Sequence, residues 1–136
     1  MPAPPKPTLT SEQRPSGLLV IHIEGELDTR STREIEPEFA RALLHRARVA
    51  LVDLRGVPFL TSAALALIVV HAQALQRGGG ALYLAGATDL VREVFDRAGF
   101  SLLFPIFPTL EEGIREVEQE LARRKQDPPA ASKGTG

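Results

Sequence analysis

Asp53-Leu54-Arg55-Gly56-Val57-Pro58-Phe59-Leu60-Thr61-Ser62-Ala63-Ala64-Leu65 is the stretch that decides the fold. It begins at the end of an apolar run, residues 48–54, that is typical of a central strand covered on both faces. The turn that follows leads into a helix, which the pattern predicts over 62–77. Ser62 therefore falls on the first turn of a helix, where a hydroxyl can cap the helix and is also placed to be modified.

The composition indicates a single domain. The chain has 136 residues, of which 43% are hydrophobic, and this is enough for one compact core. Its 16 basic and 17 acidic residues give a net charge of −1, so bulk charge offers no reason to bind nucleic acid. Cysteine is absent, which removes disulfides and thiolate chemistry and suits a cytoplasmic location. No segment approaches the roughly 20 apolar residues of a membrane span, so we expect no membrane insertion.

Both ends of the chain differ in composition from the middle. The first residues are rich in proline, and the last are small, polar and rich in proline and glycine. The start also lacks the apolar core of a signal peptide, so we expect a soluble protein that is not exported. We predict flexible tails over 1–7 and 125–136 and one domain over 8–124.

Strands and helices alternate along the predicted domain. Residues 17–25 alternate in polarity and predict a strand with one buried face, after a weaker strand near 8–14. A helix over 32–46 contains Pro37, which is tolerated only in a first turn, so this helix is expected to begin late or to bend there. The remaining expected elements are strands over 48–54, 81–85 and 102–107 and helices over 62–77, 88–98 and from Thr109 onward. This order predicts an α/β fold with a mixed central sheet of four to five strands and about four helices packed against it.

The helix predicted over 62–77 is apolar on two sides. One side carries Leu65, Ile68, Val69 and Ala72, and the other carries Ala63, Leu67, Val70 and Ala74. One of them can face the sheet. The second is either buried by the protein itself or forms a docking surface beside Ser62. It could equally pair with its own copy and give a homodimer.

Four segments resemble the STAS domain family of anti-sigma factor antagonists. Residues 23–28, Ile-Glu-Gly-Glu-Leu-Asp, resemble the Gly-Glu-Leu-Asp turn of that family, and Asp53 to Leu65 resembles its signature around a serine. The Gly78-Gly79 pair and residues 94–100, Val-Phe-Asp-Arg-Ala-Gly-Phe, resemble two later motifs. The similarity covers about residues 8–122, in order and at compatible spacing.

The resemblance implies roles for particular residues. Ser62 matches the serine that is phosphorylated by an anti-sigma factor with serine-kinase activity, and Asp28 matches a loop aspartate beside it. In that family the unmodified antagonist binds the anti-sigma factor and frees sigma, phosphate abolishes binding, and a serine phosphatase is a further expected partner. Thr61 and Ala64 stand where the common motif has aspartate and glycine, and Thr61 is a second candidate phosphoacceptor.

These features lead to one prediction and two alternatives. We predict a cytoplasmic anti-sigma factor antagonist, switched by phosphorylation, that regulates sigma-dependent transcription. Its expected partner-binding residues are Asp28, Thr61, Ser62, Ala63, Leu67 and Val70. The first alternative is a non-phosphorylated STAS scaffold subunit of a stressosome or of a lipid transporter's cytoplasmic part. The second is nucleotide binding at a pocket formed by Asp28 and Ser62.

Catalysis, metals and cofactors are not expected. Ser62 lacks the Gly-x-Ser-x-Gly surroundings of a nucleophile elbow, because Leu60 and Ala64 flank it. The three histidines fall on separate predicted elements without metal-ligand spacing: His22, His45 and His71. Asp53 is expected to be a structural carboxylate at the end of its strand.

Overall fold

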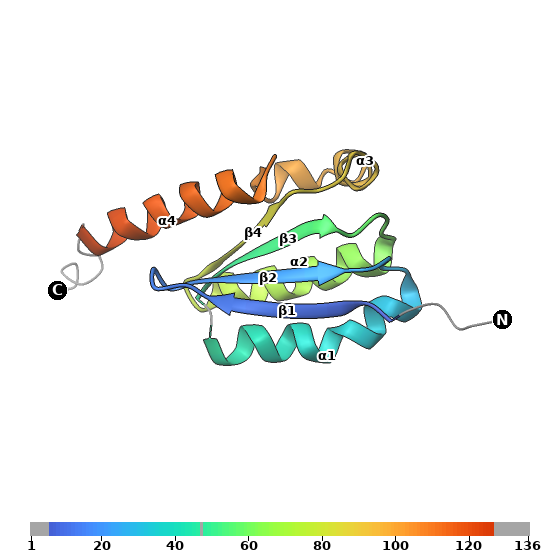
Figure 1. Cartoon of the computed structure of the whole chain (residues 1–136), viewed down its shortest axis with the longest axis horizontal. Helices are drawn as coiled ribbons and strands as arrows, with labels where there is room; N and C mark the ends of the chain where they lie inside the picture. The colour runs from blue at the N-terminus through green and yellow to red at the C-terminus, as the bar shows by residue number, and fades with distance from the viewer. Residues whose placement is uncertain (1–5, 47, 127–136) are drawn as a thin grey trace.

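A five-stranded sheet lies at the centre of the computed structural model, which describes residues 6–46 and 48–126 (Figure 1). The strands follow one another in spatial order as β1 (Thr8–Gln13), β2 (Leu18–Glu24), β3 (Val49–Gly56), β4 (Ala81–Ala85) and β5 (Ile106–Phe107). β1 is antiparallel to β2, and every later pair is parallel. The helices are α1 (Thr29–Arg46), α2 (Ser62–Arg77), α3 (Asp89–Arg97) and α4 (Leu110–Gln126). The predicted mixed sheet and helix number are confirmed.

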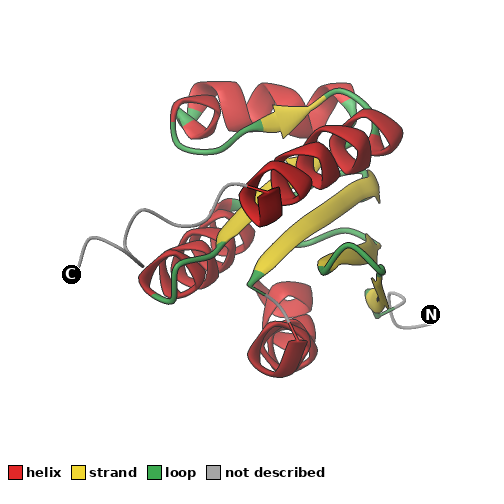
Figure 2. Ribbon diagram, turned by 90° about the vertical axis from the view of Figure 1, so that its left-hand side faces the viewer, coloured by secondary structure: helices red, strands yellow, loops and turns green. Residues whose placement is uncertain are grey.

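The helices cover both faces of the sheet (Figure 2). α1 and α2 pack against each other and against the strands, and α4 covers the opposite face, against β3, β4 and β5. The larger core cluster joins the sheet to α1, α2 and α3, and a smaller cluster lies under α4. No helix within the described residues is long and apolar enough to cross a membrane.

β2 is buried on both faces, so the prediction of one buried face is wrong. Ile21 and Ile23 belong to the larger core, whereas Leu18 and Val20 belong to the cluster under α4. The prediction failed because the helix that covers Leu18 and Val20 comes almost 90 residues later in the chain. Arg14, beyond the end of β1, binds that helix directly, with its Nε 2.7 Å from a Glu118 carboxylate oxygen.

α1 begins earlier than predicted. It starts at Thr29 and contains Pro37 in its interior. Pro37 has no amide hydrogen to give to the carbonyl one turn back, and this loss is a cost that the helix carries. Ile35 and Phe39 on either side of it are fully buried, so packing against the sheet holds the helix together across the proline.

The strand predicted over 102–107 is confirmed only at Ile106–Phe107. A short 3-10 turn, Phe100–Leu102, precedes it. The Phe100 ring lies 5.3 Å from the Phe95 ring and 5.2 Å from the Phe104 ring, measured between centroids. The turn brings three aromatic rings into contact, with Phe95 and Phe100 stacked and Phe104 tilted against Phe100.

The observed ends of the domain differ only slightly from the predicted ones. Pro7, the last residue of the predicted first tail, is buried, and a side chain on Gly25 would contact it. α4 continues to Gln126, beyond the predicted end of the domain at residue 124. The rest of the predicted tails, residues 1–5 and 127–136, lies outside the described residues.

Candidate partner-binding site

Ser62 is the first residue of α2, and its side chain is exposed. The expectation that it caps the helix is wrong, because Thr61 holds the cap position and its side chain makes no capping hydrogen bond. The Thr61 hydroxyl instead lies 3.4 Å from the carbonyl oxygen of Leu27, to which it donates. Within the described chain the Ser62 hydroxyl has no hydrogen-bond partner, so it is free to react.

Two backbone amides at the start of α2 are also free. The amides of Ala64 and Leu65 donate to the Thr61 carbonyl at 3.0 and 3.3 Å. Those of Ser62 and Ala63 have no acceptor among the described residues. Unpaired amides at a helix start, together with the helix dipole, favour a negative group. A phosphate on Ser62 would lie next to these donors.

Backbone hydrogen bonds join the Ser62 turn to the loop that carries Asp28. Leu27 and Leu60 form a parallel bridge beyond the ends of β2 and β3. The Leu27 amide donates to the Phe59 carbonyl at 3.0 Å, and the Thr61 amide donates to the Leu27 carbonyl at 3.0 Å. Asp28 therefore directly follows Leu27, whose carbonyl accepts the Thr61 amide. The Asp28 loop and the Ser62 turn, which the sequence predicted to lie together, are adjacent.

Asp28 is an exposed carboxylate that caps α1. Its Oδ1 accepts from the Ser31 amide at 2.9 Å, and its own amide donates to the Ser31 hydroxyl at 2.9 Å. These hydrogen bonds, above all the one from the Ser31 amide, hold the pKa of Asp28 below its ordinary value. The Asp28 side chain thus has a structural task and still presents a negative charge beside the Ser62 turn.

A hollow of about 320 Å³ separates the starts of α1 and α2. Its α2 wall is apolar and includes Ala63, Ala66 and the 56% exposed Val70. Leu67, which was also predicted to bind the partner, lines the same hollow, although only 7% of it is exposed and it belongs to the core. Sequence reasoning missed Ala66, although helical spacing from Ala63 to Val70 places it on the same face. The α1 wall carries Thr29, Thr32, Arg33 and Glu36.

The family model of the STAS domain matches residues 10–113 of this chain. The chain belongs to the STAS domain family. One relative is BtrV of Bordetella bronchiseptica, assigned by name to the anti-sigma factor antagonists, with 27% identity over 79% of this chain and 92% of its own length. A second is Rv2638 of Mycobacterium tuberculosis, assigned by name to the anti-anti-sigma factors, with 30% identity over 79% of this chain and 74% of its own.

Solved structures share the fold of this STAS domain. An anti-sigma factor antagonist from Mycobacterium paratuberculosis aligns with a TM-score of 0.76 and 22% identity, over 86% of this chain and 98% of its own. The antagonist SpoIIAA in its unphosphorylated form aligns with a TM-score of 0.69 and 22% identity, over 82% of this chain and 97% of its own. SpoIIAA from Bacillus has also been solved in its phosphorylated form. That structure aligns with a TM-score of 0.63 and 22% identity, over 81% of this chain and 99% of its own.

Asp53 in this STAS domain has a structural role, as expected. The residue is 4% exposed and lies within β3, which continues past it to Gly56, so the expected position at the strand end is not found. Its Oδ1 accepts from the Arg55 Nε at 3.0 Å, and its Oδ2 lies 2.6 Å from the His22 Nδ1. Burial raises the pKa of Asp53, but the hydrogen bonds from Arg55 and His22 outweigh burial and leave the pKa below its ordinary value.

The lowered pKa of Asp53 predicts how stability depends on pH. A carboxyl whose pKa falls on folding stabilises the fold above its unfolded pKa of about 3.9, and this contribution is lost as pH falls through the folded value. Asp53→Asn is expected to cost about 1–2 kcal/mol at pH 7. The difference from wild type should shrink below about pH 4. Urea unfolding of both proteins across this range measures it, with the exposed Glu116→Gln as control; a difference that stays constant with pH contradicts the prediction.

The histidines lie apart from one another. His22 contacts Asp53, and the His71 ring packs edge-on against Phe39 with 5.1 Å between centroids. Burial lowers the pKa of His71. Nothing is described for the side chain of His45. Among the described residues no group of three or more acidic or histidine side chains could hold a metal ion.

Proposed function

We propose that this STAS domain is an anti-sigma factor antagonist whose binding is switched off by phosphorylation of Ser62. The observation that supports it best is the exposed, unpaired Ser62 hydroxyl at the first residue of α2, beside free backbone amides and the Asp28 loop. The relatives and structural neighbours that carry the name anti-sigma factor antagonist support the same function. The partner would be an anti-sigma factor with serine-kinase activity, and a serine phosphatase would reverse the modification. The absence of cysteine agrees with action in the cytoplasm.

Phosphate would act on the contact surface and leave the fold in place. It adds a charge of about −1.5 to −2 at a position that presents a small neutral hydroxyl. The free amides of Ser62 and Ala63 can bind it locally, so the helix start is stabilised. A partner resting on the apolar side chains of Ala63 and Val70 would have to desolvate that charge, which costs several kcal/mol unless the partner supplies a cation.

The remaining partner-binding residues are proposed from their position. Ala63, Ala66 and Val70 line the hollow, Thr61 and Ser62 directly precede Ala63, and Asp28 follows the Leu27 that bridges to Leu60. Thr61 stays the secondary phosphoacceptor, because its hydroxyl donates to the Leu27 carbonyl and its side chain is only half exposed. Within the described residues the hydroxyl of Ser62 makes no such hydrogen bond.

The test is a phosphorylation assay with site mapping. The full chain is incubated with ATP and each serine-kinase anti-sigma factor encoded in the same genome, and the modified peptide is identified by mass spectrometry. We expect one phosphate on wild type and on Thr61→Val, and none on Ser62→Ala. If Ser62→Ala is still phosphorylated and Thr61→Val is not, the phosphoacceptor is Thr61. No phosphate with any kinase, together with a stable complex in a larger assembly, would favour the scaffold alternative.

A further inference from the structure

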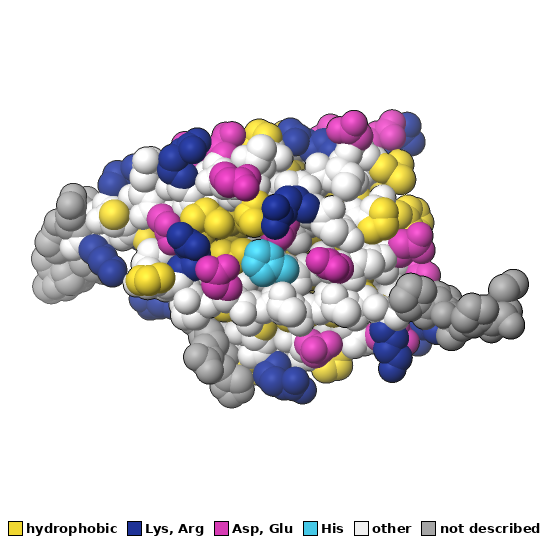
Figure 3. Space-filling model, in the orientation of Figure 1, with side chains coloured by type: hydrophobic (Ala, Val, Ile, Leu, Met, Phe, Trp, Pro, Cys, Tyr) yellow, Lys and Arg dark blue, Asp and Glu magenta, His cyan; other side chains and the backbone are white. Residues whose placement is uncertain are grey.

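The two edges of the sheet differ in how well they are protected. β5 has only two residues, Ile106–Phe107, and lies between Pro105 and Pro108. Short strands and prolines are the usual means by which proteins prevent an edge from pairing. β1 has six residues, contains no proline and carries one charged side chain, Glu12. In Figure 3 the surface over β1 is largely white, which marks backbone and uncharged polar side chains.

The hairpin between β1 and β2 determines which backbone groups of β1 face outward. The Arg14 amide donates to the Leu18 carbonyl at 2.9 Å, so Arg14 is a residue bonded to β2. In an antiparallel pair, bonded and non-bonded residues alternate. Leu9, Ser11 and Gln13 therefore turn their amide and carbonyl groups away from β2. Within the described chain these groups have no partner.

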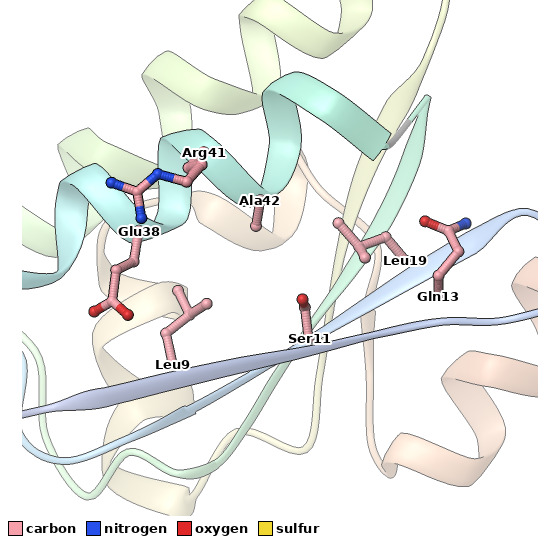
Figure 4. A pocket seen from close by; sticks show the side chains of 7 residues that line it. All are labelled: Leu9, Ser11, Gln13, Leu19, Glu38, Arg41 and Ala42. Carbon is pink, nitrogen blue, oxygen red and sulfur yellow. The ribbon is translucent and has the colours of Figure 1, made fainter.

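The side chains of the same three residues line a hollow between β1 and α1 (Figure 4). Its volume is about 580 Å³, and Leu19 of β2 and Ala42 of α1 provide apolar walls. Glu38 and Arg41 line it from the α1 side. Unpaired backbone groups and a hollow thus lie on one edge, which is the arrangement that receives an added strand.

We propose that β1 pairs with β1 of a second copy of this chain, antiparallel and with the two-fold axis at Ser11. Each Ser11 then bonds to the other Ser11, and each Leu9 bonds to Gln13 of the second copy. All outward amides and carbonyls of these residues find partners. Glu12 lies opposite Thr10 of the second copy, so no like charges face each other.

Neighbouring registers are less favourable. Directly opposed residues point to the same face, so the register can move only in steps that keep odd residues opposite odd residues. Moving the axis to Thr10 puts Gln13 opposite Pro7, which has no amide hydrogen. Moving it to Glu12 puts two Glu12 carboxylates opposite each other, which is repulsive. Ser11 is the one position of the three that avoids both problems.

Charge complementarity on α1 points to a second copy as the occupant. A two-fold axis perpendicular to the sheet keeps both α1 helices on one face, where they run antiparallel beside each other. The hollow is lined by Leu9, Ser11 and Gln13 on β1 and by Glu38, Arg41 and Ala42 on α1, so the midpoint between Glu38 and Arg41 lies beside Ser11. Glu38 of each copy then lies opposite Arg41 of the other, and two ion pairs form across the axis.

A charge exchange on α1 tests the pairing. Glu38→Arg and Arg41→Glu each replace two attractive contacts by repulsive ones and should raise the dimer dissociation constant roughly tenfold or more. The double variant Glu38→Arg/Arg41→Glu restores both pairs and should return to within about threefold of wild type. Sedimentation equilibrium over a wide concentration range measures the constant, with Glu116→Arg on α4 as the control that has the same charge change as Glu38→Arg. A full chain that stays monomeric, or a dimer that neither single variant weakens, overturns the proposal.

Cysteine cross-linking tests the register, since the native chain has no cysteine. Thr10 and Glu12 of the second copy form a non-bonded opposed pair, in which the β-carbons come closest. Oxidising a mixture of Thr10→Cys and Glu12→Cys should join the two variants by a disulfide. Cross-linking of Thr10→Cys to itself would place the axis at Thr10 and overturn the register.

Discussion

Ser62→Asp is expected to weaken anti-sigma factor binding by about 100-fold or more. The exposed hydroxyl at the first residue of α2 becomes a carboxylate next to Ala63, which together with Val70 lines the apolar wall of the hollow. An unpaired charge that is desolvated in an interface costs about 3–5 kcal/mol. The same carboxylate interacts favourably with the helix start, so the melting temperature should stay equal or rise slightly. Binding and stability therefore move in opposite directions.

Ser62→Asn is the matched control for this charge. Asparagine has nearly the same size and shape as aspartate but carries no charge. Isothermal titration with the anti-sigma factor that phosphorylates the chain should show Ser62→Asn binding within about tenfold of wild type. Equal affinities for the Asp and Asn variants would show that bulk, and not charge, controls the contact, and unchanged affinity in both would refute the switch.

Gly80→Ala is expected to destabilise the domain by about 3 kcal/mol or more, which is a large part of the stability of a small domain. A β-carbon on Gly80 would lie 1.7 Å from the carbonyl oxygen of Arg48 and 2.7 Å from its carbonyl carbon. Both are backbone atoms that cannot rotate away. The same Arg48 carbonyl accepts the Ala81 amide at 2.9 Å, so the start of the β3–β4 pairing would have to separate.

Gly78→Ala, two residues earlier, is the matched control. Its β-carbon would approach only the Leu75 and Ala74 carbonyl oxygens, at 3.6 and 4.0 Å, and its φ of −90° suits alanine. We expect a change within about 0.5 kcal/mol for this variant. Urea unfolding of both variants measures the difference. Equal stability of the two would mean that the β3–β4 backbone can relax at no cost.

Elements with local signals could be predicted from the sequence. The helix predicted over 62–77 is found as Ser62–Arg77, because an apolar pattern starts after two hydroxyl residues and three glycines follow it. The helix predicted from Thr109 onward is found as Leu110–Gln126, and the Thr109 hydroxyl accepts from the Glu112 amide at 3.0 Å, as in a capping box. Phe104 misled the prediction of a strand over 102–107, because its ring packs against Phe100 of the preceding turn and is not part of a strand.

The candidate site was predicted in outline but not in detail. Ser62 and Asp28 were placed beside each other by family resemblance, and the Leu27–Leu60 bridge supplies the physical reason. Which of Thr61 and Ser62 caps α2 depends on the hydrogen bond from Thr61 to Leu27, 34 residues away. The burial of Leu67 likewise follows from packing between α1, α2 and the sheet. Neither could be read from neighbouring residues alone.

The bridge between Leu27 and Leu60 also bears on how fast the surface around Ser62 can respond. Both loops are already held by backbone hydrogen bonds, so they lose little conformational entropy when another molecule lands on them. Capture by such a rigid surface is paced by diffusion and ionic strength, without waiting for a rearrangement. Under the proposed switch, the slow steps of signalling would then belong to the enzymes that attach and remove the phosphate, and the ratio of their activities would set the speed of the response.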